Sequence, residues 1–107
     1  MPLFEITDQN FKQEVLQASG VILLDFGAQW CAPCKKLDPI VEELAKDYAG
    51  RAKIAKIDIG VNREVASHFG VMNVPTLLFL KDGKVSSSFT SLVPKNKLAQ
   101  TLDGLLA

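Results

Sequence analysis

Residues 21–34 read VILLDFGAQWCAPC, and the rest of the chain is organised around this stretch. Its first six residues are apolar on both alternating sides apart from Asp25, which is typical of a central strand covered on both faces. After Cys34, apolar residues recur at helical spacing. They are Leu37, Val41, Leu44 and Tyr48. Both cysteines of the chain therefore lie where a strand pattern gives way to a helix pattern.

Cap and breaker signals define the elements on either side of this junction. A short first strand is expected at residues 3–6, followed by a helix that Thr7 or Asp8 can cap and that ends at Gly20. The helix after the cysteines contains Pro39, which removes a backbone hydrogen bond and is expected to kink it.

The second half of the sequence predicts three strands and two helices. Asp82-Gly83 is a turn signal that joins the last two strands in a hairpin. Asn62 can cap the first of the two helices, and Pro94 suits the first turn of the second. The strands are expected at residues 53–59, 74–80 and 85–89, and the helices at residues 62–69 and 94–105.

The order of these elements predicts an α/β fold. Strands and helices alternate first, which implies parallel strands joined by right-handed crossovers, and the final hairpin adds antiparallel pairing. We therefore expect a single central mixed sheet of about five strands, flanked by four helices. A chain of 107 residues has the length of one domain, so residues 1–107 are expected to form a single domain.

Composition argues against several classes of function. The chain has 12 basic and 12 acidic residues and a net charge of zero, so it lacks the basic field that binds nucleic acid or anionic membranes. No apolar stretch approaches the roughly 20 residues of a membrane span. The N-terminus lacks the pattern of a signal peptide, so a cytoplasmic protein is expected, with a processed exported form as the alternative. The two cysteines and His68 are too few for a structural zinc site, and we expect no metal.

The motif Cys31-Ala32-Pro33-Cys34 predicts dithiol–disulfide exchange. A helix that begins near Cys31 places its sulfur at the positive end of the helix dipole, which favours a thiolate. Cys31 would then be the nucleophile, and Cys34, one turn later on the same face, would attack the mixed disulfide. Pro33 stiffens the loop between them. The alternative is a pair of buried structural cysteines, but a Cys-X-X-Cys motif near a β-α-β pattern indicates redox function.

Four further residues each allow two interpretations. A carboxylate in a doubly covered strand is costly, so Asp25 is expected to have a raised pKa and to take the Cys34 proton. Alternatively, Asp25 lies at the strand end, turned to water or bonded to the backbone. Lys56 either pairs with Asp25 or is solvated. Pro75 is typical of a strand start or edge, and a cis bond before it is the much rarer alternative. Trp30 either receives substrate or covers the core.

These motifs resemble the thioredoxin family over essentially the whole chain. The resemblance implies the thioredoxin fold and a protein-disulfide reductase whose partners are disulfide-containing client proteins and a thioredoxin reductase drawing on NADPH or ferredoxin. We expect a monomer without a bound cofactor, since the redox group is the cysteine pair itself. The matching residues are Asp25-Phe26, Trp30-Cys31, Pro33-Cys34, Pro39, Lys56, Val74-Pro75-Thr76 and Asp82-Gly83.

The resemblance also implies roles for individual residues. Cys31 would be the attacking thiolate and Cys34 the resolving thiol, with Asp25 as the buried base and Lys56 as its charged neighbour. Pro75 would be cis and packed against the sulfurs. The groove that receives a substrate peptide would be formed by Trp30, Ala32, Pro33, Val74, Pro75, Ser91 and Leu92.

Four positions depart from the family pattern. Gly27 replaces an aromatic residue, Ala32 and Ser91 replace glycines, and Gly60 replaces an aspartate. These departures bear on the redox potential, the range of clients and recognition by a reductase. Two alternative functions also stay open: a disulfide oxidase or isomerase on the same fold, and a non-catalytic thioredoxin-like docking module.

Overall fold

A computed structural model describes residues 3–107. Met1 and Pro2 lie outside the described residues. The predictions for the N-terminus and for a domain of residues 1–107 are therefore not tested at these two positions. None of the helices within the described range is long and apolar enough to cross a membrane. The elements are β1 (Leu3–Glu5), the π-helical turn η1 (Lys12–Leu16), β2 (Val21–Gly27), α1 (Ala32–Asp47), β3 (Ala52–Asp58), α2 (Arg63–His68), β4 (Thr76–Lys81), β5 (Lys84–Phe89) and α3 (Lys95–Leu106).

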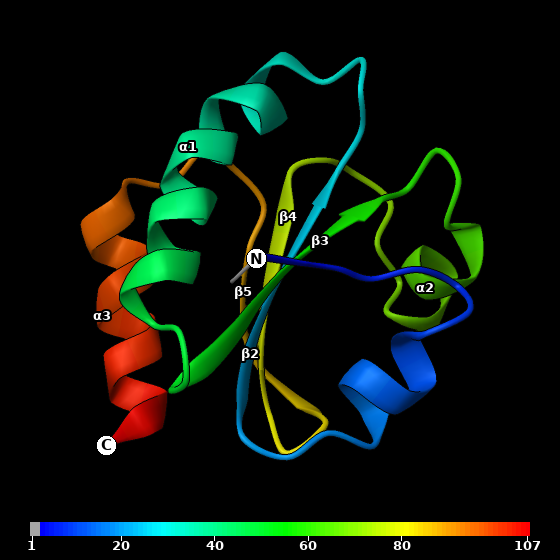
Figure 1. Cartoon of the computed structure of the whole chain (residues 1–107). Helices are drawn as coiled ribbons and strands as arrows, with labels where there is room; N and C mark the ends of the chain where they lie inside the picture. Colours follow the sequence, from blue (N-terminus) through cyan, green and yellow to red (C-terminus); the bar gives the residue numbers. More distant parts are fainter. Residues whose placement is uncertain (1–2) are drawn as a thin grey trace.

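The five strands form one mixed sheet in the order β1-β3-β2-β4-β5. β2 is the central strand, parallel to β3 and antiparallel to β4, which confirms the prediction from its apolar pattern. Figure 1 shows α1 and α3 on one face of the sheet and α2 with η1 on the other. The carboxyl end of β2 is therefore enclosed by its neighbours and leads directly into the loop before α1.

Each face of the sheet has its own apolar core, because alternate residues of β2 point to opposite sides. Leu23 packs in the core beneath α1 and α3, whereas Leu24 packs in the core beneath α2 and η1. The apolar residues that recur at helical spacing after Cys34 pack in the first of these cores. They are Leu37, Val41, Leu44 and Tyr48.

Most predicted boundaries are wrong by one or two residues, and two of these differences involve proline. β4 begins at Thr76 rather than at residue 74, since Pro75 has no N–H to donate to the strand ladder. Pro94 is the N-cap of α3 rather than part of its first turn. Pro39 lies inside α1, as expected.

The N-terminal helix differs most from the prediction. It is a π-helical turn of 5 residues whose N-cap is Phe11, and neither Thr7 nor Asp8 caps it. Instead, Asp8 caps α2, because its Oδ1 accepts a hydrogen bond of 2.9 Å from the Val65 N–H. Asn62, the predicted cap of α2, makes no side-chain cap bond, and its Oδ1 accepts from the Asp8 N–H at 3.1 Å. The cap of α2 thus comes from a distant segment, which a local sequence pattern does not show.

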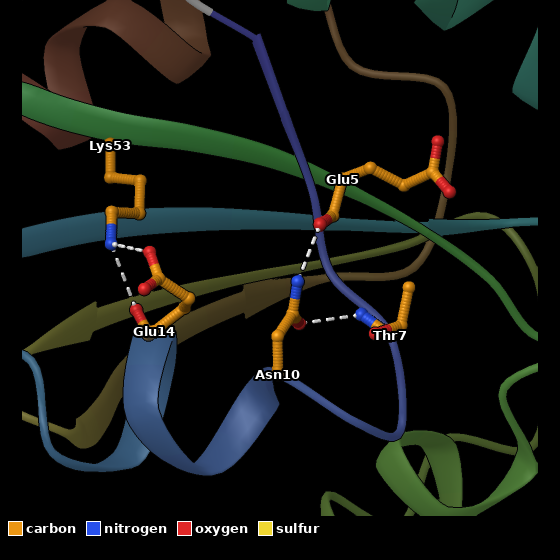
Figure 2. Close-up of polar contacts among 5 residues, drawn as sticks. All are labelled: Glu5, Thr7, Asn10, Glu14 and Lys53. Atoms are coloured by element: carbon orange, nitrogen blue, oxygen red, sulfur yellow. Dashed lines mark hydrogen bonds and ion pairs between the residues drawn. The ribbon is translucent and has the colours of Figure 1, made fainter.

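Polar contacts fix the segment around η1 to β1 and β3 (Figure 2). The Asn10 side chain donates to the Glu5 carbonyl at 3.0 Å and accepts from the Thr7 N–H at 2.7 Å. Lys53 Nζ, on β3, donates to both the backbone oxygen and Oε1 of Glu14, each at 3.1 Å. These bonds hold η1 against the sheet although no side chain caps it.

Candidate active site

The Cys31–Cys34 disulfide lies at the N-terminus of α1. Cys31 is the N-cap of the helix, with φ −99° and ψ 107°, and its Sγ accepts a hydrogen bond of 3.3 Å from the Cys34 N–H. Pro33 stands in the first turn, where its missing N–H removes no helical bond. A thiolate at Cys31 would therefore be stabilised by the helix dipole and by a backbone N–H that already points at the sulfur.

The two cysteines lie almost buried in a small apolar cluster. Cys31 is 5% exposed and Cys34 is 6% exposed. Ala28 completes the cluster, and Val74 packs against it. The Val74–Pro75 peptide bond is cis, as expected, and Pro75 is buried. The segment before β4 therefore forms part of the wall around the disulfide.

The other predicted groove residues are exposed. Trp30 is 75% exposed, so it does not cover the core. Ala32 and Pro33, between the cysteines, are also at the surface. Ser91 and Leu92 are exposed in the loop between β5 and α3, and neither belongs to the buried cluster around the disulfide.

Asp25 is a buried carboxylate near the end of β2. It shares the α1 face of the sheet with Leu23, and it is 2% exposed. Its Oδ1 has no hydrogen-bond partner among residues 3–107. Burial raises the pKa of Asp25 from its usual 3.8 to about 7, while the charge of Lys56 lowers it in part and the charge of Asp38 adds to the rise. A strand-end carboxylate turned to water is therefore excluded, and no backbone N–H holds Oδ1.

Lys56 lies beside Asp25 but makes its ion pair elsewhere. The two residues are Cα partners in the register of β2 and β3, yet Lys56 Nζ donates to Asp38 Oδ1 at 2.7 Å. Burial lowers the pKa of Lys56, but the hydrogen bond and charge of Asp38 outweigh this effect and raise it overall. Lys56 is therefore neither a purely solvated lysine nor a hydrogen-bonded partner of Asp25.

Asp38 is the residue of this site that the sequence analysis missed. It follows Cys34 by four residues, so the two lie on the same face of α1. A search for charged residues one helical turn after Cys34 would have found it.

A cleft of about 650 Å³ opens beside Cys34, and its lining includes Asp25, Asp38 and Lys56. Gly27 also lines the cleft, and its lack of a side chain leaves space beside Cys34. A Cβ at position 27 would lie 3.3 Å from the Cys34 Cβ and 3.4 Å from its Sγ, so a larger residue would press against Cys34. The buried carboxylate and the second cysteine therefore share one cleft.

The site defines a class of protein. Its cysteines are separated by two residues and joined at the N-terminus of a helix that follows the central strand of a mixed sheet. That arrangement is typical of thiol–disulfide oxidoreductases. Residues 3–107 contain no group of three or more His, Cys, Asp or Glu side chains that could hold a metal ion.

Comparisons with known proteins identify the family. The thioredoxin family model matches residues 2–104. Thioredoxin 2 of Chlorobaculum tepidum is 47% identical over 100 residues, which cover 94% of this chain and 92% of that protein. Thioredoxin of Pseudomonas aeruginosa is 40% identical over 101 residues, which cover 94% of each. The solved structure of a mutant thioredoxin from Halobacterium salinarum has a TM-score of 0.88 and 33% identity, with 98% of this chain and 91% of that chain covered.

The chain belongs to the thioredoxin family. It is accordingly a thiol–disulfide oxidoreductase, and the fold expected from the sequence is confirmed.

Proposed function

We propose that this chain reduces protein disulfides with Cys31 as the attacking thiolate, Cys34 as the resolving thiol and Asp25 as the proton acceptor. The observation that carries this assignment is the hydrogen bond from the Cys34 N–H to Cys31 Sγ at the N-terminus of α1. That N–H and the helix dipole both favour negative charge on the Cys31 sulfur. Lys56, beside Asp25 in the sheet, is proposed as the charged neighbour of the acceptor.

The reaction proceeds in two exchanges. The Cys31 thiolate attacks a client disulfide, so that one client S–S bond breaks and a mixed disulfide forms. Cys34 then gives its proton to the Asp25 carboxylate and attacks the Cys31 sulfur, which releases the client with both its sulfurs reduced and leaves the Cys31–Cys34 disulfide. Two electrons pass from this chain to the client. A pKa of about 7 suits Asp25 to this role, since its carboxyl can both take and release a proton at neutral pH.

We propose that client peptides bind in an apolar groove around the disulfide. Trp30 precedes the attacking cysteine and offers a large exposed ring, and Val74 packs against the cysteine cluster. Met72, which is 88% exposed, adds apolar surface just before Val74. The proposed groove residues are Trp30, Ala32, Pro33, Val74, Pro75, Ser91 and Leu92.

We further propose that the chain is a cytoplasmic monomer, with residues 1–107 as one thioredoxin domain, that carries electrons from a thioredoxin reductase to client proteins. Both cysteines belong to the redox motif, so neither is left for a structural disulfide of the kind that secreted proteins use. The net charge of zero supplies no electrostatic attraction to nucleic acid or membranes.

Separate replacement of the two cysteines tests these roles. We expect the wild-type chain to accelerate the reduction of insulin by dithiothreitol and the Cys31→Ser variant to lose this acceleration entirely, since it has no attacking sulfur. We expect Cys34→Ser to attack a client but not to release it, so that a mixed disulfide through Cys31 accumulates on a non-reducing gel.

Two outcomes would change the assigned roles, and one measurement tests the direction of the reaction. Full activity of Cys31→Ser in its biological context would favour the docking module, and a client trapped through Cys34 in the Cys31→Ser variant would reverse the two roles. A glutathione redox titration of the wild-type pair separates a reductase from an oxidase or isomerase, because the direction of exchange follows the reduction potential.

A further inference from the structure

Three charged residues form a row across the sheet beneath α1. Glu5 of β1 is the Cα partner of Lys56 of β3, and Lys56 is in turn the Cα partner of Asp25 of β2. All three face α1, because the residue two positions earlier on each strand packs in the core beneath that helix. Figure 2 shows the Glu5 carboxylate pointing away from the Asn10 amide that binds its backbone. The single cation of the row thus lies between two carboxylates.

The Lys56 ammonium nevertheless pairs with a third carboxylate. Asp38 of α1 lines the same cleft, and its Oδ1 accepts a hydrogen bond of 2.7 Å from Lys56 Nζ. Asp25 Oδ1, by contrast, receives no hydrogen bond from residues 3–107. Of these two carboxylates, the Lys56 ammonium therefore neutralises that of Asp38 and makes no hydrogen bond to Asp25 Oδ1.

We propose that Asp38 is a positioning residue that holds the Lys56 ammonium away from Asp25 and thereby governs proton transfer from Cys34 to Asp25. The proposal rests on the proposed roles of Cys34 and Asp25 and adds to them a residue that touches neither sulfur. In the resolving step the Cys34 S–H bond breaks and its proton passes to Asp25, and the Cys34 thiolate then forms the S–S bond to Cys31 while the bond from Cys31 to the client breaks.

The direction of the effect follows from electrostatics. An ammonium bound to Asp25 would stabilise its carboxylate and make it a weaker base. With the ammonium bound to Asp38, the Asp25 carboxylate stays poorly solvated and takes the proton readily at neutral pH.

Other charged groups also face the Asp25 carboxyl. After burial, the charges that most affect the pKa of Asp25 are those of Lys56 and Asp38, and they act in opposite directions. On the β4 side its Cα partner is Leu77, which carries no charge. The charged groups that line the cleft around Asp25 are Glu5 from β1, Lys35 and Asp38 from α1, and Lys56 and Asp58 from β3.

The Asp38→Asn variant tests the proposal. The substitution removes a negative charge and frees Lys56 to turn toward Asp25, and both changes lower the pKa of Asp25. We expect its titration midpoint to fall by about one pH unit. Carbon-13 NMR of the Asp25 carboxyl measures this midpoint in the disulfide form, in which the two cysteines do not titrate. As a matched control, Asp47→Asn removes an α1 carboxylate that pairs with Lys95 at 2.9 Å, and it should leave the midpoint unchanged.

A double-mutant cycle separates positioning from a direct charge effect. In a Lys56→Met background there is no ammonium to release, so Asp38→Asn should move the Asp25 midpoint by less than half as much as it does in the wild type. Asp38→Glu keeps a carboxylate for Lys56 and should restore the midpoint. The pH profile of the resolving step, followed in a single turnover with a client disulfide, should move with the Asp25 midpoint in each variant.

Two results would overturn the proposal. One is a midpoint that moves by less than about 0.3 pH unit in Asp38→Asn. The other is an equal shift in the presence and absence of Lys56. Trapping of a client by Cys34→Ser is measured in parallel. If no client is trapped, the proposed roles of the cysteines are wrong. If a client is trapped but the Asp25 midpoint does not move in Asp38→Asn, only the proposed role of Asp38 is wrong.

Discussion

The two faces of the sheet receive different side chains from the same central strand. On the α2 face all of these residues are apolar and buried, whereas on the α1 face the last of them is an acid. The α2 face receives Ile22, Leu24 and Phe26, and the α1 face receives Val21, Leu23 and Asp25. The acid falls where β2 approaches the Cys31–Cys34 disulfide, so the difference between the faces coincides with the redox site.

One face of β2 is therefore entirely apolar, whereas the other also holds the buried carboxyl group that we propose as the proton acceptor. Burial of an apolar side chain is favourable, while burial of a carboxyl group whose oxygen lacks a hydrogen bond is costly. The α1 face is therefore less stable than it would be with an apolar residue at position 25. Substitutions on the two sides of β2 should accordingly have opposite signs.

Leu24→Ala breaks the apolar face and should have the largest effect. Leu24 is fully buried beneath α2 and η1, so its truncation removes apolar contacts and leaves a cavity. We expect the free energy of unfolding to fall by about 2–5 kcal/mol, measured by urea unfolding of the disulfide form at pH 7. Val85→Ala, at a side chain on β5 that is 52% exposed, is the control and should stay within about 0.5 kcal/mol of the wild type. A loss below about 1 kcal/mol at Leu24 would show that the α2 face is loosely packed.

Asp25→Asn alters the residue that follows Leu24 in β2 and should stabilise the protein above neutral pH. The pKa of Asp25 is raised from 3.8 to about 7, so the unfolded chain loses this proton at a lower pH than the folded protein does. The contribution of the Asp25 proton to stability is fully present below about pH 4 and is lost as the pH rises to about 7. The shift in pKa corresponds to a gain of at most about 4 kcal/mol in the free energy of unfolding of Asp25→Asn over the wild type. An amide group without a hydrogen-bond partner in the variant would reduce this gain.

Urea unfolding across pH 4 to 8 measures this prediction. The stability of Asp25→Asn relative to the wild type should grow between pH 4 and pH 7 and then stay constant. The values at pH 4, where the side chain of residue 25 is neutral in both folded proteins, serve as the internal control. A difference that does not change over this range would mean that the pKa of Asp25 is not raised.

The features that local patterns could predict are concentrated along β2 and α1. The double-sided apolar run of β2, the helical stripe beginning at Leu37 and the position of Cys31 at the start of α1 each follow from residues close together in the sequence. The run left the burial of Asp25 as one of two interpretations, and the structure shows that Asp25 is buried. The cis bond before Pro75 came from the family resemblance, because periodicity carries no information about peptide isomers.

The features that the sequence analysis missed depend on contacts between distant segments. Lys56 had two candidate environments, solvent or Asp25, and it pairs instead with Asp38, 18 residues away. Asp8 caps a helix 57 residues further along the chain. In both cases the packing of whole elements decided which group the polar side chain could reach.

Asp8→Ala should have the smallest of the three effects on stability, and it tests such a long-range contact on the α2 face. Asp8 Oδ1 accepts the Val65 N–H at 2.9 Å, so its removal leaves the first turn of α2 without this cap and should cost about 1 kcal/mol in urea unfolding. Asp8→Asn keeps an acceptor oxygen and should recover most of the loss. Thr7→Ala is the matched control, because Thr7 was the other predicted cap of η1, and it should change stability by less than about 0.5 kcal/mol. Equal losses of stability in Asp8→Ala and Thr7→Ala would favour a local cap of η1 over the long-range cap of α2. In that case α2 would be held on the sheet by apolar packing alone.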